Sequence, residues 1–181
     1  MNWILIVAMV GVALTGALAI AAAIAAGASD GASEGSDAER SAIWQAGFAP
    51  ADLQVLAALA ARARVDLAAS QVEVVLWHAG HGIVVTGSRL PPGRFGATVA
   101  PGEGVAGRAL AAGRTTAAGV GTTDDNGLVA IAVPIPTADG VAGVIAATGL
   151  FGAADVPRLE ALAAEAGRRL SADGSGVRHA G

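Results

Sequence analysis

The first part of the chain contains a long uncharged run. From residue 3 to residue 26 no acidic or basic side chain occurs, and almost every residue is apolar. At about 1.5 Å per residue, a helix over this run spans about 36 Å, more than the roughly 30 Å hydrocarbon core of a bilayer. We therefore predict a transmembrane anchor at residues 1–26, and any folded domain must come from the rest of the chain.

A cleavable secretory signal is the alternative for the same residues. Residues 26–28 are all small, as at a cleavage site. However, the two residues before the run supply no basic charge, and the run exceeds the roughly 7–15 apolar residues of such a signal. The nearest basic residue is Arg40, on the C-terminal side, which favours a single pass through the cell membrane with the domain in the cytoplasm.

Two absences narrow the chemistry of the chain. Among its 181 residues there is no Cys, which excludes disulfides, thiolate metal sites and thiol nucleophiles. There is also no Lys, and the formal net charge is −4. Because a nucleic-acid footprint needs clustered positive charge, no nucleic-acid partner is expected.

The part after the apolar run divides by composition. Residues 27–48 form an acidic, flexible linker rich in Gly, Ser, Asp and Glu over its first half. Residues 49–170 alternate between helical and strand patterns and are the predicted domain. Residues 171–181 return to small and polar side chains and are a predicted disordered tail.

Within the domain, apolar spacing predicts three helices. The first opens at Pro50 and continues to about Leu67; a short one covers residues 105–112 and ends at Gly113. The last begins near Asp155 and carries an apolar face, with Glu165 and Arg169 spaced to pair at i, i+4 on its outer side.

Six short strands are predicted between these helices. They cover residues 71–77, 83–86, about 97–100, 115–120, 128–135 and 141–148, and a turn-rich loop is expected at 121–127. The last two strands are joined at Asp139 and Gly140, a pair suited to a tight hairpin. In the strand at 128–135 the bulky residues take the odd positions and Ala130 and Ala132 the even ones. This order predicts an α+β fold with a mostly antiparallel sheet.

Residues 102–107 match the spacing G-x-G-x-x-G of a dinucleotide-binding loop. The context contradicts that function, because Pro101 interrupts the preceding strand, the next helix ends at Gly113, and the strongest strands form a hairpin. The glycines are better explained by a sharp turn and a close approach of helix and sheet.

Three segments in the right order resemble the GAF domain family: residues 101–114, the hairpin at 128–146, and residues 151–166. The match covers about residues 50–170. It implies a six-stranded antiparallel sheet, helices on one face, and a ligand pocket under loops on the other face. It also implies a regulatory module that binds a small molecule or forms a homodimer through its bounding helices.

Several subfamily functions fail on this sequence. The Lys-containing signature of the cyclic-nucleotide-binding members is absent, and bilin-binding and sulfoxide-reducing members both use a Cys. His78 and His81 stand in a predicted turn, too few to make a metal site, so we expect exposed turn residues, no metal and no cofactor. If the resemblance holds, the pocket is lined by Arg94, Phe95, Glu103, Arg108, Asp124 and Asp125.

The sequence therefore supports a non-enzymatic, membrane-anchored sensory or regulatory module. It would take an unknown small molecule or dimerise, and it would signal to a separate protein because the chain has no output domain of its own. The alternative is a ligand-free scaffold for protein interaction. An enzyme has the least support, since no serine has a base and an oxyanion site around it in sequence.

Overall fold

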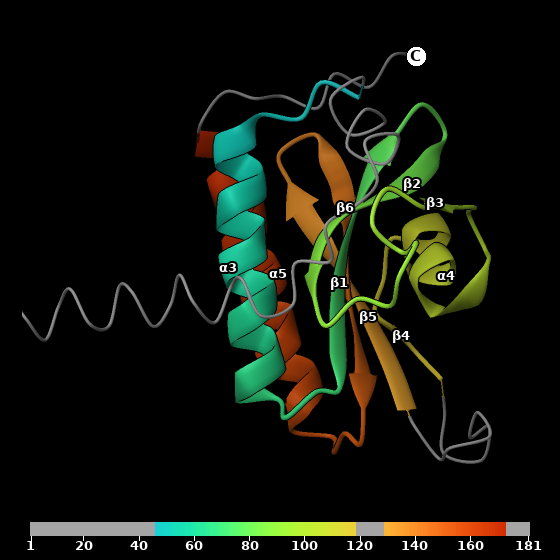
Figure 1. Ribbon diagram of the computed structural model, residues 1–181, viewed down its shortest axis with the longest axis vertical. Coiled ribbons are helices and arrows are strands. Elements are labelled where there is room, and N and C mark those ends of the chain that lie inside the picture. The colour runs from blue at the N-terminus through green and yellow to red at the C-terminus, as the bar shows by residue number, and fades with distance from the viewer. Residues whose placement is uncertain (1–45, 119–128, 173–181) are drawn as a thin grey trace, which may run out of the picture. The chain divides into compact units, whose positions relative to one another are not determined.

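The computed structural model describes residues 46–118 and 129–172, and these form an α+β fold. Within those ranges, six strands make one sheet in the order β3-β2-β1-β6-β5-β4, and all five neighbouring pairs are antiparallel (Figure 1). Three helices, α3, α4 and α5, accompany the sheet, as predicted. The predicted anchor at residues 1–26 and the loop at 121–127 lie outside the described residues.

Two hairpins build the centre of the sheet. β1 (Gln71–His78) and β2 (His81–Ser88) meet at a turn of Ala79 and Gly80, which both have positive φ. β5 (Val129–Thr137) and β6 (Gly140–Gly149) are longer than predicted and pair from Val129–Gly149 to Thr137–Gly140. The turn between them is therefore Ala138 and Asp139, one residue earlier than predicted, and Gly140 already belongs to β6.

The two edge strands are short. β3 (Thr98–Val99) pairs with β2, and β4 (Thr116–Ala117) pairs with β5. Both lie within or beside the stretches predicted for them. The sheet edges thus lead directly into α4 (Gly104–Ala112), which follows β3 and precedes β4.

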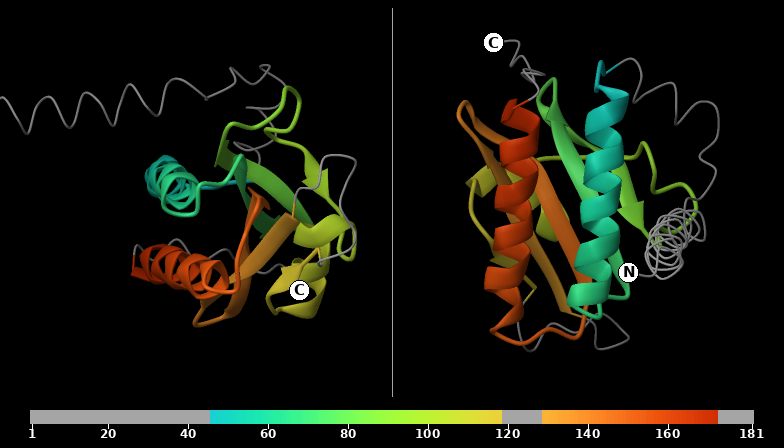
Figure 2. Two further views of the ribbon diagram at one scale, coloured as in Figure 1. Left: turned by 90° about the horizontal axis from the view of Figure 1, so that it is seen from below. Right: turned by 90° about the vertical axis from the view of Figure 1, so that its left-hand side faces the viewer.

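Two long helices cover one face of the sheet (Figure 2). α3 (Pro50–Asp66) begins with a proline, whose missing N–H is no loss at the first helical position. α5 (Asp155–Ala172) lies beside it and packs on β5. Their buried leucines, among them Leu56 and Leu159, meet the bulky odd-numbered residues of β5 in the larger apolar cluster.

The opposite face carries only α4 in the described part of the chain. The buried side chains on this face are smaller than those under α3 and α5. They include Val75 and Val144 from the sheet and Ala106, Ala109 and Leu110 from α4. Ala132 belongs to this cluster, whereas Ile131 and Val133 belong to the other. The predicted alternation in this strand is therefore confirmed.

Candidate functional site

The resemblance predicts a ligand on the face of the sheet that carries α4, so this face is the first candidate site. Val75, Val84 and Val144 have no exposed surface there, and Leu110 of α4 packs against them. Successive side chains of a strand alternate between faces, so Glu73 lies on the same face as Val75. The described part of this face is thus mostly apolar packing with one carboxylate within it.

Glu73 is held by Arg94 in a two-pronged ion pair. Arg94 Nε donates to Glu73 Oε2 at 2.7 Å, and Arg94 Nη2 donates to Oε1 at 2.8 Å. The Glu73 side chain is 10% exposed and that of Arg94 is 33% exposed. The hydrogen bond to Glu73 raises the pKa of Arg94 above its ordinary value, and the negative charges of Glu73 and Glu103 add to this effect against the opposing effect of burial.

The ion pair fixes the connection between β2 and β3 over the sheet. Gly96 N donates to Val84 O at 2.8 Å, and Ala97 N donates to Arg94 O at 3.2 Å. Arg94 was predicted to meet a ligand, but here its guanidinium is occupied by a carboxylate of the same chain. Sequence reasoning missed Glu73, whose only signal was a single charge inside the apolar strand at 71–77.

The other predicted site residues are not gathered on one face of the sheet. Phe95 is half-buried and packs against the larger apolar cluster. Glu103 is exposed just before α4, and Arg108 is exposed on that helix without an ion pair in the described part of the chain. Asp124 and Asp125 lie outside the described residues. The structure therefore brings Arg94 and Glu103 within electrostatic reach of each other. It shows no side-chain hydrogen bond or ion pair among the four described residues.

The glycine-rich turn before α4 serves packing. A Cβ at Gly107 would overlap the carbonyl oxygen of Ala100, so only glycine lets the helix come this close to the preceding segment. The Gly102 N–H donates to Gly107 O at 2.7 Å and closes the turn. α4 has 9 residues and the sheet is antiparallel, which agrees with excluding a dinucleotide-binding fold.

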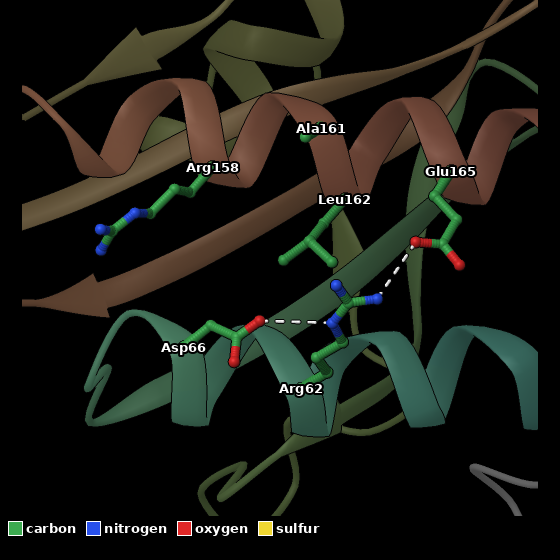
Figure 3. A pocket seen from close by; sticks show the side chains of 6 residues that line it. All are labelled: Arg62, Asp66, Arg158, Ala161, Leu162 and Glu165. Carbon is green, nitrogen blue, oxygen red and sulfur yellow. Dashed lines mark hydrogen bonds and ion pairs between the residues drawn. The ribbon is translucent and has the colours of Figure 1, made fainter.

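A second candidate site lies on the opposite side of the domain, between α3 and α5 (Figure 3). We call it the helix groove; its volume is about 460 Å³ and it is lined by Arg62, Asp66, Arg158, Ala161, Leu162 and Glu165. Arg62 joins the two helices, because its Nε lies 3.3 Å from Asp66 Oδ2 and its Nη1 lies 3.3 Å from Glu165 Oε2. Glu165 therefore pairs with Arg62 across the groove, and the predicted pairing with Arg169 is wrong.

The two histidines of the first hairpin contact aromatic rings. His78 and His81 stack edge to face with centroids 6.2 Å apart, and Phe48 meets His78 at 6.1 Å. Among the described residues, no group of three or more His, Asp or Glu side chains is arranged to hold a metal ion. Over the same residues, none of the helices is apolar over a length that would cross a bilayer.

Comparison with known proteins shows the fold. No protein-family model matches the chain, and a search of curated protein sequences finds no match. Among solved structures, the GAF-B domain of DevS from Mycobacterium smegmatis matches with a TM-score of 0.59 and 21% identity, over 68% of this chain and 96% of that domain. The GAF domain of a phosphoenolpyruvate-protein phosphotransferase from Acinetobacter matches with a TM-score of 0.59 and 13% identity, over 77% and 94%.

An enzyme shares the same architecture. A type II free methionine-R-sulfoxide reductase from Thermoplasma acidophilum matches with a TM-score of 0.54 and 13% identity, over 65% of this chain and 90% of the reductase. Identities this low establish the fold alone. The domain therefore has a GAF-like fold, with the sheet and helices that the sequence resemblance implied.

Proposed function

We propose that this chain is a GAF-like regulatory module that associates with a second copy through the helix groove and passes its state to a separate signalling protein. The observation that carries the proposal is the arrangement of charges around the groove. Two arginines, one aspartate and one glutamate line it, so its formal charge is zero. A surface with balanced charges can meet its own copy across a two-fold axis without net repulsion.

The exposed groups of the groove are those that a second copy would reach. The Arg158 side chain is 62% exposed, and its ion-pair partner among the described residues is Asp155, at 3.4 Å. Asp66 is 46% exposed. Ala161 also lines the groove and is exposed on α5. A two-fold axis near Ala161 would bring Arg158 of one copy toward the carboxylates of the other. The small side chain of Ala161 leaves room for close approach of the two helix pairs.

The test uses the absence of Cys from the chain. In the full chain, Ala161→Cys is expected to form a disulfide-linked dimer under mild oxidation, because the axis would bring the two thiols together. Ala111→Cys, at an exposed position of α4, is the matched control and is expected to remain uncrosslinked. Equal crosslinking of the two variants, or a monomeric full chain by analytical ultracentrifugation, would sink the proposal.

A charge test separates the groove from other contacts. Arg62→Glu places three carboxylates together and is expected to weaken association. The exchange Arg62→Glu with Glu165→Arg keeps the pair within one copy and is expected to restore association in part. If the single variant associates as the unaltered chain does, the charges of the groove play no part in it.

Small-molecule sensing is the second candidate function, and the free charge of Arg108 favours it. An exposed guanidinium without an ion pair in the described residues is suited to receive a carboxylate or phosphate. A thermal-shift panel of metabolites on the full chain, repeated with Arg108→Gln, tests this function. If no compound shifts the melting temperature while crosslinking captures a specific partner, the domain is a ligand-free scaffold.

We also propose that residues 1–26 anchor the domain in the cell membrane with the domain in the cytoplasm. The support is the uncharged run at residues 3–26. An anchored chain stays in the membrane pellet after alkaline carbonate extraction and keeps its N-terminal residues. A mature N-terminus near residue 28 would show instead that the segment is a cleaved signal. The proposed role involves no catalysis.

A further inference from the structure

A second hollow lies at the end of the sheet where α3 ends. β1 begins there and both β2 and β6 end there, because Val72 pairs with Ser88 and Gln71 pairs with Thr148. We call it the corner hollow; its volume is about 730 Å³, and its lining includes Arg64, Val65, Ser70, Arg89 and Leu150. It shares no lining residue with the helix groove. Its volume falls in the range of about 300–1,000 Å³ that is usual for small-molecule sites.

Exposed apolar side chains gather at this hollow. In the part of the chain that the structure describes, the large hydrophobic residues that remain exposed are Val65, at 67%, and Leu150, at 76%. Both line the corner hollow, although they come from α3 and from the segment after β6. A single exposed hydrophobic residue needs no explanation, but two at one hollow indicate a partner with an apolar part.

The charge at the hollow is positive and uncompensated. Arg64 and Arg89 line it, and no acidic side chain does. Arg64 Nε donates to Ser88 Oγ at 2.9 Å, which leaves its two terminal nitrogens without a partner in the described residues. Arg89 follows Ser88 in the chain and forms no ion pair there either. Two neighbouring cations in a chain of net charge −4 are suited to share an anion.

The backbone around the two arginines is well defined. Ser70 N and Ser70 Oγ both donate to Thr148 O at 2.8 Å, which joins the start of β1 to the end of β6. Arg89 has φ +57, a left-handed conformation that non-glycine residues adopt rarely. The hollow is thus formed by residues at the hydrogen-bonded end of the sheet.

We propose that the corner hollow binds a free aliphatic carboxylate of short to medium chain length. Arg64 and Arg89 would receive the carboxylate, and Val65 and Leu150 would cover the chain. This site is separate from the face that carries α4 and from the helix groove, so its test stands apart from the proposed self-association.

The experiment is isothermal titration of the full chain in phosphatidylcholine discs with hexanoate, and with empty discs as the blank. Two matched compounds separate the contributions: acetate keeps the carboxylate and lacks the chain, and hexanol keeps the chain and lacks the charge. Hexanoate is expected to bind, and each of the other two to bind roughly tenfold more weakly or not at all.

Variants locate the binding. Arg89→Gln is expected to weaken hexanoate about tenfold, because it removes charge-assisted hydrogen bonds to the carboxylate. Leu150→Ser is expected to weaken hexanoate and leave acetate unchanged. Arg168→Gln is the control, because this arginine of α5 is exposed and has no ion pair in the described residues, and it is expected to leave hexanoate binding unchanged.

Three outcomes would overturn the proposal. One is no measurable binding of hexanoate, and another is binding that Arg89→Gln and Arg168→Gln weaken equally. The third is no binding of hexanoate together with tighter hydrogen-exchange protection around Leu150 in discs of anionic lipid than in neutral discs. That result would assign the corner hollow to the membrane surface.

Discussion

The two faces of the sheet differ in the size of their side chains and in what covers them. The face under α3 and α5 carries Leu76, Ile135 and Ile145, all fully buried, beneath two long helices. The face under α4 carries valines, alanines and the Glu73–Arg94 ion pair beneath a helix of 9 residues. Since burial of apolar area is the main source of stability, most of the folding free energy should come from the first face.

The difference in side-chain size predicts how each face responds to substitution. Truncation of a buried side chain should therefore cost more stability on the first face, where the side chains are larger, than on the second. The proposed binding residues on α4 lie on the second face, and the helix groove lies on the solvent side of the first.

Removal of a large side chain from the first face should have the largest effect. Leu159→Ala deletes a side chain of α5 with no exposed surface, and the cavity should lower the free energy of unfolding by about 2–5 kcal/mol. Urea unfolding followed by circular dichroism measures it. Leu150→Ala is the matched control, because that leucine is 76% exposed and should change stability by less than about 0.5 kcal/mol. Equal losses in the two variants would contradict the placement of the core.

Enlargement of a small residue on the second face should also lower the free energy of unfolding, because there is no room for a larger side chain. Gly107→Ala would place a methyl group on the carbonyl oxygen of Ala100, and we expect a loss of about 1–3 kcal/mol. Helix propensity alone predicts the reverse, a gain of about 1 kcal/mol. Gly152→Ala is the control, since its Cβ would find its nearest atom 3.8 Å away at Asp155. A stabilised Gly107→Ala variant would show that α4 can move away from the preceding segment at Ala100.

The ion pair of the second face is expected to have a smaller effect. Arg94→Met leaves the carboxylate of Glu73 mainly buried without its counter-charge, and should lower the free energy of unfolding by about 1–2 kcal/mol. The partial exposure of Arg94 keeps this below the loss at a fully buried pair. Adding Glu73→Val should recover part of the loss, and a double-mutant cycle measures the coupling. Strictly additive effects would mean that the pair contributes nothing of its own.

The sequence predicted the elements far better than the contacts. Periodicity was enough to place the helices at Pro50 and Asp155 and to assign Ile131 and Ala132 to opposite faces, because both depend on neighbours within a few residues. The predicted turn at Asp139 and Gly140 lies one residue too late in the chain. The register of the two strands is set by the pairing of Thr137 with Gly140, and this pairing overrides the preference of an Asp-Gly pair for the turn itself.

The candidate sites depended on partners that are distant in the chain. Arg94, in the connection between β2 and β3, pairs with Glu73 of β1, and Arg62 pairs with Glu165 across 103 residues. Local spacing offered Arg169 as the partner of Glu165 and an external ligand as the partner of Arg94. Local spacing cannot predict which of these partners a side chain will pair with, because that depends on which helices and strands the fold brings side by side. The corner hollow escaped prediction for the same reason.

The ion pairs of the helix groove should have the smallest effect on folding. Arg62 is 59% exposed, and exposed pairs contribute about 0–1 kcal/mol, so Arg62→Met should leave urea unfolding of the protomer within that range. The same variant should weaken the association proposed for the groove, because it removes the cation that holds Asp66 and Glu165 in place. A loss of folding stability above about 2 kcal/mol would make Arg62 a structural link between α3 and α5. The groove would then belong to the stable face and would no longer be a free surface for a second copy.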